Sequence, residues 1–374
     1  MPRILSVDEI RAAAPDPFPS GGDPIARARE RMQATRQWHP NQALGRRYGV
    51  GCVALEITQR CNLDCTLCYL SESSEALKDI PLAEVYRRID VICAHYGPGT
   101  DIQVTGGDPT LRDRAELAAI VKRIRDRGMR SSLFTNGIKA SRHLLQELAH
   151  AGLTDVAFHV DLTQQRVGYA TEASLNQVRL EYIERARGLP LHVVFNTSVF
   201  DGNVAQIPAI VRFFVANADV VQFASFQLQA NTGRGVLGGR EVQALTPDNI
   251  ARLIDEGAGA AVSFGALLAG HTDCNRYAST LVVNGRVYDV LADRDFVARL
   301  LESMTDVRFD RRDRRRAMEA VMRWLVDEPR RALECLPKAA RSLWQMRRDL
   351  IAARGKVGKL SFFIHNFIFC FSFF

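Results

Sequence analysis

The chain has 374 residues, with 49 Lys or Arg against 42 Asp or Glu, so its formal net charge is +7. Hydrophobic residues make up 47% and charged residues 24%, which is typical of globular proteins and excludes wholesale disorder. Residues 308–359 hold 16 basic and 7 acidic residues, which leaves 33 basic and 35 acidic residues elsewhere. The basic character therefore belongs to one C-terminal block and not to the whole protein.

The N-terminal segment does not resemble a secretion signal, because Asp8 and Glu9 interrupt it and no apolar core follows. No run of the sequence reaches the roughly 18 to 20 apolar residues of a membrane span. Three of the eight cysteines fall within eight residues, which is more typical of metal binding or catalysis than of disulfides in a reducing compartment. We therefore expect a cytoplasmic protein, with peripheral attachment to the inner face of the membrane as an alternative.

Strand and helix patterns alternate along the chain from Val53 onward. A helix is expected first at 25–37, with Asp23 as its N-cap. The six predicted strands span 53–57, 101–105, 131–135, 156–160, 192–196 and 220–228, and apolar residues at helical spacing follow the earlier ones. This order predicts an α/β fold whose parallel sheet forms a (βα)6 partial TIM barrel, with the functional residues at the C-terminal strand ends.

The regular alternation stops after the sixth strand. A short helix is expected at 247–256, a hairpin at 280–290 with its turn at Asn284-Gly285, and helices at 296–304, 317–325 and 339–353. The Phe-rich segment 360–374 has the composition of the start of a strand, so we expect a truncated or frame-shifted end. The predicted regions are an N-terminal extension (1–50), the core barrel (51–230), a loop, helix and hairpin extension (231–292) and a basic helical C-terminal region (293–374).

The most specific motif is the array Cys61-x₃-Cys65-x₂-Cys68, which directly follows the first strand. Three thiolates on one loop can hold three corners of a cubane iron–sulfur cluster and leave its fourth iron open. Two alternatives are a three-cysteine zinc site completed by a distant histidine, and unrelated free thiols.

Two further motifs follow the next strands. Gly106-Gly107-Asp108 ends the second strand, where a glycine pair lets a ligand approach the backbone and the Asp108 carboxylate can accept hydrogen bonds from an amine. Asn136 follows the third strand. Further pocket candidates at strand ends are His159, Asp161, Asn196, Ser198, Gln227 and Gln229.

In these motifs and in their order along the strands, the sequence resembles the radical S-adenosylmethionine (radical SAM) enzymes between about Val53 and Gln229. The resemblance implies that Cys61, Cys65 and Cys68 ligate a [4Fe–4S] cluster and are the catalytic residues. S-adenosylmethionine (SAM) would chelate the fourth iron, and its reductive cleavage would give a 5′-deoxyadenosyl radical that abstracts a substrate hydrogen.

The resemblance also implies the residues that bind SAM. The Gly106-Gly107 backbone and Asp108 would hold the methionine amine, and the backbone at Leu67 would contact adenine. Asn136 and Asp161 are further candidates for cofactor contacts. Asp108 stands where the family usually has glutamate, and Leu67 stands where it favours an aromatic residue; Tyr69 follows the third cysteine instead.

The substrate is expected to be lipid-like, because Gln103 to Thr110 and His271 to Tyr277 resemble a lipid-modifying, tetraether-synthase-like subset of the family. Peptide or small-metabolite modification is the alternative within the family, and a non-catalytic iron–sulfur or zinc protein is the alternative outside it. The resemblance implies a reductant of the flavodoxin or ferredoxin type. An auxiliary cluster is a weaker expectation, since only Cys274, Cys335 and Cys370 lie beyond the barrel.

The basic block has two interpretations. It is either a solvated face of a helix packed against the barrel or a surface for anionic lipid headgroups. Nucleic acid is not expected as a partner, because no aromatic stacking platform accompanies the charge. Gly233 to Gly238 fits a dinucleotide-binding pattern, but without a helix after it we expect a loop.

Overall fold

The structure is a computed structural model that describes residues 22–34, 50–70, 74–229, 245–268, 275–305, 307, 309 and 314–366. Two segments singled out above lie outside these residues: the glycine-rich stretch 233–238, and His271 to Cys274. Cys370 also lies outside them.

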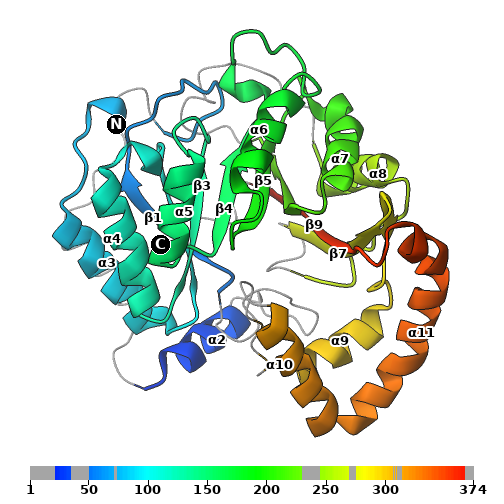
Figure 1. Ribbon diagram of the computed structural model, residues 1–374. Coiled ribbons are helices and arrows are strands. Elements are labelled where there is room, and N and C mark those ends of the chain that lie inside the picture. Colours follow the sequence, from blue (N-terminus) through cyan, green and yellow to red (C-terminus); the bar gives the residue numbers. More distant parts are fainter. Residues whose placement is uncertain are drawn as a thin grey trace, which may run out of the picture.

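The strands form one nine-stranded sheet in the order β1-β2-β3-β4-β5-β6-β9-β7-β8 (Figure 1). The first six strands pair in parallel, β9 is parallel to β6, and β7 is antiparallel to both β9 and β8. The predicted α/β fold with a parallel partial barrel is therefore confirmed. The strands are β1 (Val53–Thr58), β2 (Asp101–Gly106), β3 (Arg130–Thr135), β4 (Asp155–His159), β5 (His192–Val199), β6 (Val221–Leu228), β7 (Asn275–Val283), β8 (Arg286–Tyr288) and β9 (Gly358–Asn366).

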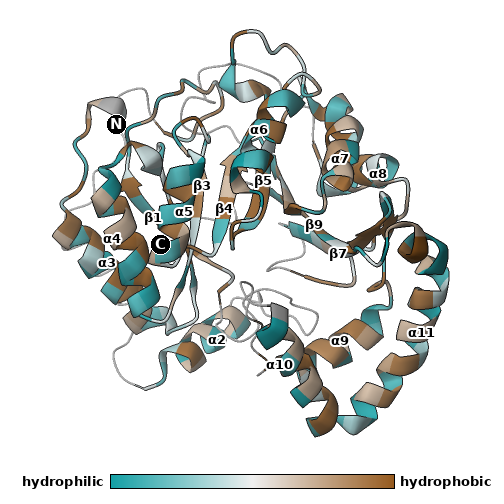
Figure 2. Cartoon of the chain, in the orientation of Figure 1, coloured by the Kyte–Doolittle hydropathy of each residue, from teal (hydrophilic) through white to brown (hydrophobic). Residues whose placement is uncertain are grey.

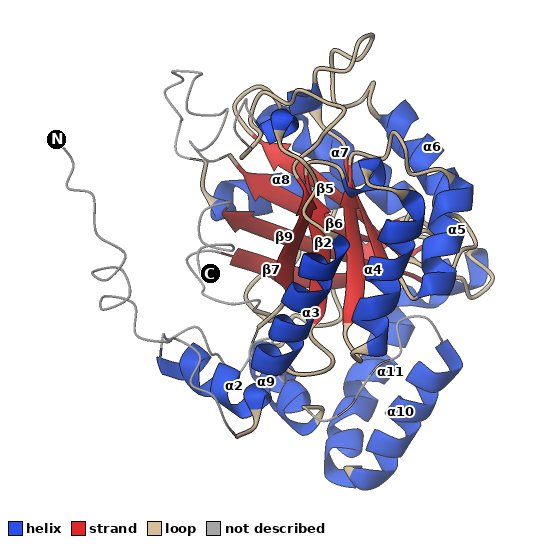
Figure 3. Cartoon of the chain, turned by 90° about the vertical axis from the view of Figure 1, so that its left-hand side faces the viewer, coloured by secondary structure: helices blue, strands red, loops and turns tan. Residues whose placement is uncertain are grey.

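Helices cover the outer face of this sheet (Figure 3). Their apolar stripes meet the outward-facing strand residues in one continuous core, as in the contact of Phe158 with Tyr182, whose ring centroids lie 5.0 Å apart. The helices of this layer are α3 (Leu82–Tyr96), α4 (Arg114–Asp126), α5 (Arg142–Ala151), α6 (Asn176–Ala186), α7 (Ile207–Ala216) and α8 (Pro247–Ala258). Short 3₁₀ turns lie at η1 (Ser74–Ala76), η2 (Pro109–Leu111), η3 (Leu162–Gln164) and η4 (Val204–Gln206).

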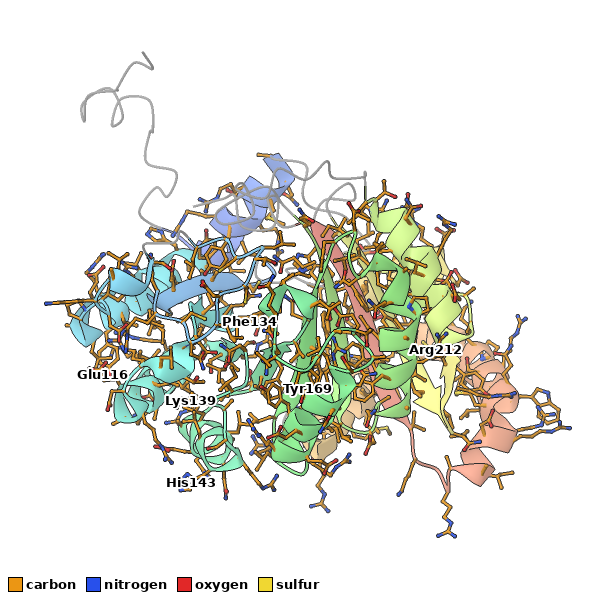
Figure 4. The ribbon with its side chains drawn as sticks, turned by 90° about the horizontal axis from the view of Figure 1, so that it is seen from above. Glu116, Phe134, Lys139, His143, Tyr169 and Arg212 are labelled. Carbon is orange, nitrogen blue, oxygen red and sulfur yellow. The ribbon has the colours of Figure 1, made fainter. Side chains whose placement is uncertain are left out.

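The alternation of side chains along the strands separates an outer from an inner face. Phe158 on β4 and Phe195 on β5 both point toward the helices, with ring centroids 5.6 Å apart. Their neighbours His159 and Asn196 are paired in register and therefore share the opposite, inner face. In the view from above, Phe134 of β3 lies toward the middle, whereas Glu116 of α4 lies at the outer edge (Figure 4).

The remaining helices are α2 (Pro24–Ala34), α9 (Arg294–Ser303), α10 (Arg314–Asp327) and α11 (Pro329–Ala352). Helix α11 begins ten residues before the predicted 339–353 and contains Pro337, which lacks the N–H of a helical hydrogen bond. The expected turn at Asn284-Gly285 is confirmed, since both residues have positive φ between β7 and β8. Of the helices among the described residues, none is both long enough and apolar enough to cross a membrane.

The C-terminal strand β9 inserts between β6 and β7. The strand expected to begin at residue 360 is thus present, and it lies within the sheet. Leu360, Phe362 and Ile364 are fully buried in the main core, and their neighbours Phe363 and His365 lie on the inner face. The last part of the predicted helical region 293–374 is therefore part of the same sheet as the barrel strands.

Candidate active site

The three cysteines of the array lie on the loop that follows β1, at the C-terminal edge of the sheet. Cys61, Cys65 and Cys68 are half-buried, and none forms a disulfide. The loop turns tightly between the second and third cysteine, where the N–H of Cys68 donates to the carbonyl of Cys65 at 3.3 Å. Burial raises the pKa of the Cys61 thiol, and the charges of Asp108 and Cys68 raise it further, whereas a backbone hydrogen bond from Leu63 lowers it.

Two arginines, Arg60 and Arg112, hold the start of this loop. Arg60 donates to both carboxylate oxygens of Asp79, at 2.5 and 3.2 Å, and to the carbonyl of Leu111 at 2.9 Å. Arg112 is almost fully buried and donates to the carbonyl of Ile57 at 2.7 Å. Burial favours the neutral form of Asp79, but hydrogen bonds from Arg60 and Thr58 outweigh it and lower the pKa of the carboxyl. The residue before the first cysteine is therefore fixed in place.

The glycine pair at the end of β2 packs against the backbone of the same loop. Gly106 has φ +133°, and a Cβ there would lie 1.8 Å from the carbonyl oxygen of Thr58. A Cβ on Gly107 would lie 2.2 Å from the carbonyl oxygen of Arg60. The close approach that the glycine pair predicted is thus present, but in this structure the partner is the protein's own backbone.

Tyr69 attaches the C-terminal end of the cysteine loop to the end of β2. Its hydroxyl donates to the carbonyl of Gly106 at 3.1 Å. Burial raises the pKa of this phenol well above its usual value, so the hydroxyl keeps its proton. Both ends of the cysteine loop are therefore held at Gly106-Gly107. In the sequence, Tyr69 is an aromatic residue that follows the third cysteine instead of preceding it. The sequence does not reveal its hydrogen bond to Gly106, which lies 37 positions away.

Asp108 is fully buried, and both of its carboxylate oxygens accept hydrogen bonds from the protein. Oδ1 accepts from the backbone N–H and the hydroxyl of Thr110, at 2.9 and 2.5 Å. Oδ2 accepts from the hydroxyl of Thr135 at 2.8 Å and from the backbone N–H of Asn136 at 2.9 Å. The carboxylate thus joins the end of β2 to the end of β3.

Asn136 connects this strand end to the cysteine loop. Its side-chain amide donates to Oδ1 of Asn62 at 2.7 Å and to Sγ of Cys61 at 3.8 Å. Arg166, which no sequence pattern singled out, donates to the Asn136 carbonyl at 2.8 Å. Asn136 is thus the predicted site residue that the structure brings into direct contact with the array, while Leu67 lies half-buried on the loop itself.

Asp161 occupies the corresponding place after β4. It is fully buried, and it accepts hydrogen bonds from the N–H of Thr163 at 2.9 Å, the N–H of Ser198 at 2.7 Å and Nε2 of His159 at 2.6 Å. Burial by itself would lower the pKa of His159, but the adjacent Asp161 carboxylate outweighs it and raises that pKa. The half-buried imidazole of His159 is therefore the polar group that this cluster presents to the inner face.

The turn after Asp161 also contacts the cysteine loop, since the N–H of Thr66 donates to the carbonyl of Thr163 at 3.0 Å. A fully buried ion pair between Arg179 and Glu172 holds the backbone of this turn. Arg179 donates to the carbonyl of Val160 at 2.8 Å, and Glu172 accepts from the N–H of Leu162 at 3.1 Å.

Polar side chains continue along the inner face from β4 to β9. Three hydrogen-bonded pairs bridge successive strands, and we call their six residues the polar row. The pairs are His159 with Ser198 at 3.2 Å, Asn196 with Gln227 at 3.2 Å, and Ser225 with His365 at 3.0 Å. The sequence named His159, Asn196, Ser198 and Gln227, but it missed Ser225 and His365, which become neighbours only through the insertion of β9. Gln229 instead pairs through its backbone N–H with Val199.

Comparison with known proteins matches residues 55–214 to the family described as the Radical SAM superfamily. The chain is 29% identical over 186 residues to 7,8-dihydro-6-hydroxymethylpterin dimethyltransferase of Methanocaldococcus jannaschii, covering 48% of this chain and 36% of that protein. It is 30% identical over 183 residues to PqqA peptide cyclase of Bradyrhizobium diazoefficiens, covering 47% and 46%. The chain thus spans less than half the length of these curated relatives.

Similar solved structures include SuiB of Streptococcus suis bound to precursor peptide SuiA, with a TM-score of 0.39 and 14% identity over 63% of this chain and 51% of that chain. SuiB bound to S-adenosylmethionine gives a TM-score of 0.40 and 15% sequence identity, and the match covers 55% of this chain and 47% of that chain.

Members of the superfamily are enzymes that use a [4Fe–4S] cluster and SAM, the two cofactors that the resemblance implied. The sequence match at residues 55–214 covers the cysteine loop, the glycine pair, most of β1 and all of β2 to β5. Residues 55–214 of this chain thus match the radical SAM superfamily.

Proposed function

We propose that Cys61, Cys65 and Cys68 bind a [4Fe–4S] cluster at which SAM is cleaved reductively, so that the chain activates a C–H bond of its substrate. When bound, the cluster supplies the electron and SAM the 5′-deoxyadenosyl radical. The observation that carries this proposal is the loop geometry: three half-buried thiols, none of them in a disulfide, lie on one loop whose two ends are held at Gly106-Gly107.

The donor set fits a cluster better than a single metal ion. Among the residues that the structure describes, no three His, Cys, Asp or Glu side chains form a group that could hold one metal ion. A zinc ion needs its sulfur ligands about 2.3 Å from one centre. A cubane instead takes one thiolate at each of several separate iron atoms, so its ligands stand farther apart. We therefore favour the cluster over the zinc alternative.

The chain's own residues hold the cysteine loop in place. Arg60, Arg112 and Tyr69 fix its two ends, and Asn136 donates toward Cys61. Leu67, Gly106, Gly107, Asp108, Asn136 and Asp161 remain the residues that we propose for SAM binding. For Asp108 and Asp161, complete burial and the hydrogen bonds to neighbouring strand ends favour a role in positioning the pocket walls.

For the substrate we propose a polar molecule, of the peptide or small-metabolite class, and not the lipid-like molecule that the sequence favoured. The polar row supports this choice, because its amide, hydroxyl and imidazole groups can hydrogen-bond a polar substrate in addition to one another, whereas an alkyl chain can use none of them. The names of the relatives, a PqqA peptide cyclase and a pterin dimethyltransferase, agree with it.

Radical SAM enzymes need a reductant, and here we propose a small electron-transfer protein of the flavodoxin or ferredoxin type. We also propose an anionic lipid surface as the partner of α10 and α11. Val326, Leu333, Trp344 and Ile351 on these helices are between 66% and 79% exposed, and the same two helices carry several arginines. Figure 2 shows hydrophobic and hydrophilic residues side by side along both helices. A cytoplasmic location at the inner face of the membrane would follow from this partner.

The function is tested by loading the full chain with iron and sulfide under anaerobic conditions, reducing it, adding SAM and measuring 5′-deoxyadenosine. We expect about four irons per chain and product formation in the wild type, and neither in Cys65→Ala. A protein that takes up zinc but not iron, or that forms a full cluster without product, would contradict the proposal. More iron and sulfide than one cluster requires would indicate the auxiliary cluster.

The substrate class is tested by adding cell-extract fractions to the same reaction. We expect an aqueous peptide and metabolite fraction to raise the yield of 5′-deoxyadenosine, and a lipid extract in detergent to leave it unchanged. Stimulation by the lipid fraction alone would restore the lipid-like substrate.

A further inference from the structure

Asn136 presents its amide group to the cysteine loop in a defined orientation. Its Oδ1 accepts a hydrogen bond from the N–H of Ile138 at 3.0 Å, so the side-chain oxygen is directed away from the loop. The NH₂ group therefore faces the loop, where one N–H reaches Oδ1 of Asn62 and the other reaches Sγ of Cys61. The local turn thus decides which end of the amide meets the sulfur.

The backbone of Asn136 is held from two sides as well. Its N–H donates to the buried Asp108 carboxylate, and its carbonyl accepts from Arg166. Together with the turn to Ile138, these contacts leave the amide little freedom to rotate away from Cys61. A donor held in this way before any ligand binds loses no further conformational entropy when it acts on the sulfur.

We propose that Asn136 is a positioning residue for the cluster, whose N–H···S hydrogen bond orients the Cys61 thiolate and raises the reduction potential. A donor aimed at a ligating sulfur stabilises the state with more negative charge on that sulfur, which is the reduced state. This inference rests on the proposed function, because it needs Cys61 to be a cluster ligand. It adds a role for a side chain that neither the array nor the glycine motif contains.

The test is a redox titration of the loaded full chain without SAM, followed by the electron paramagnetic resonance signal of the reduced cluster. The variants are Asn136→Ala, which removes the amide, and Asn136→Asp, which keeps the shape and the Ile138 contact but replaces the donor by a carboxylate oxygen. We expect Asn136→Ala to shift the reduction equilibrium about tenfold toward the oxidised state, which for one electron is about 59 mV. Asn136→Asp should shift it further.

Asn62→Ala is the matched control, because it removes the other partner of the same NH₂ group and leaves the Cys61 contact in place. We expect its potential to stay near that of the wild type. A variant at 136 that melts like the wild type but takes up iron 10- to 100-fold more weakly also supports the proposal, since lost outer-shell contacts have this effect. Wild-type potential and iron uptake in both variants would overturn it.

This outcome can be told apart from failure of the proposed function. If the wild type forms no [4Fe–4S] cluster, the function itself fails. If the wild type forms the cluster and makes 5′-deoxyadenosine while the variants at 136 keep its potential and its iron uptake, only the role of Asn136 fails.

Discussion

Asp108 and Asp161 make the same contacts at the ends of two different strands. Each lies two residues after the end of its strand, is fully buried, and accepts hydrogen bonds from the N–H and hydroxyl of the threonine two residues on. Each also accepts from a backbone N–H at the end of the next strand, that of Asn136 and that of Ser198. Both carboxylates therefore join neighbouring strand ends at the edge that carries the cysteine loop.

We expect Asp108→Ala to lower the free energy of unfolding by about 3 kcal/mol, because it leaves several buried donors at the ends of β2 and β3 without an acceptor. Urea unfolding of the metal-free chain measures the change. Asp113→Ala is the control, since it removes only the N-cap of α4 and should lose about 1 kcal/mol. Equal losses in the two variants would contradict the joining role of Asp108.

Gly107→Ala should displace the start of the cysteine loop, because the added Cβ would lie 2.2 Å from the carbonyl oxygen of Arg60. Overpacking of this kind costs about 1–3 kcal/mol, and we expect iron uptake to fall along with the melting temperature. Gly265→Ala is the matched control, since no atom lies within 4 Å of the Cβ position there. Full iron loading of Gly107→Ala would show that the loop tolerates the shift.

His159 should stabilise the fold in a limited pH range. Asp161 raises the pKa of His159 and His159 lowers that of Asp161, with Glu172 and Arg166 as the other nearby charges. The stabilisation from this pair is therefore complete below the pKa of about 6.5 that histidine has in the unfolded chain, while Asp161 is still ionised. It disappears as the pH rises through the raised pKa of His159.

Urea unfolding of the wild type and His159→Gln between about pH 5 and pH 9 checks this range. We expect the largest difference in the free energy of unfolding near pH 6 and a smaller one at pH 9. A difference that is constant across the range would mean that His159 contributes by packing and not by charge.

Glu172→Gln should destabilise the chain by about 3–5 kcal/mol, because it leaves the fully buried guanidinium of Arg179 without its charge partner. Thermal and urea unfolding measure this loss. The control is Glu181→Gln, which breaks the partly exposed pair with Arg185 and should change stability by less than about 1 kcal/mol. A small effect at Glu172 would argue that water reaches the turn after β4.

If α10 and α11 meet an anionic lipid surface, the chain should sediment with phosphatidylserine-containing vesicles and not with phosphatidylcholine vesicles. Reversing the charge of Arg341 and Arg348 together should weaken this binding tenfold or more, at about 1 kcal/mol per charge. Arg212→Glu on the exposed side of α7 is the control. Vesicle binding that depends neither on the lipid charge nor on Arg341 and Arg348 would contradict an anionic lipid surface as the partner.

The sequence determined the parts of this protein that local patterns encode. Apolar periodicity, capping residues and the turn at Asn284-Gly285 specify elements within a few residues of chain, so the six parallel strands and the hairpin could be predicted. The array Cys61, Cys65 and Cys68 was equally readable, because its spacing lies within one loop, and together with Gly106-Gly107-Asp108 it carried the resemblance to the superfamily.

Tertiary structure alone decided which distant groups meet. Parallel strands pair residues from separate βα units, so the contact of Asp161 with Ser198 joins positions 37 apart, and that of Ser225 with His365 joins positions 140 apart. No local pattern records such a register, and β9 takes its place by pairing with β6 and β7 while its apolar side joins the main core. The polar row and the hydrogen bond from Asn136 to Cys61 therefore come from the packing of the sheet, while the chemistry of the loop comes from the sequence.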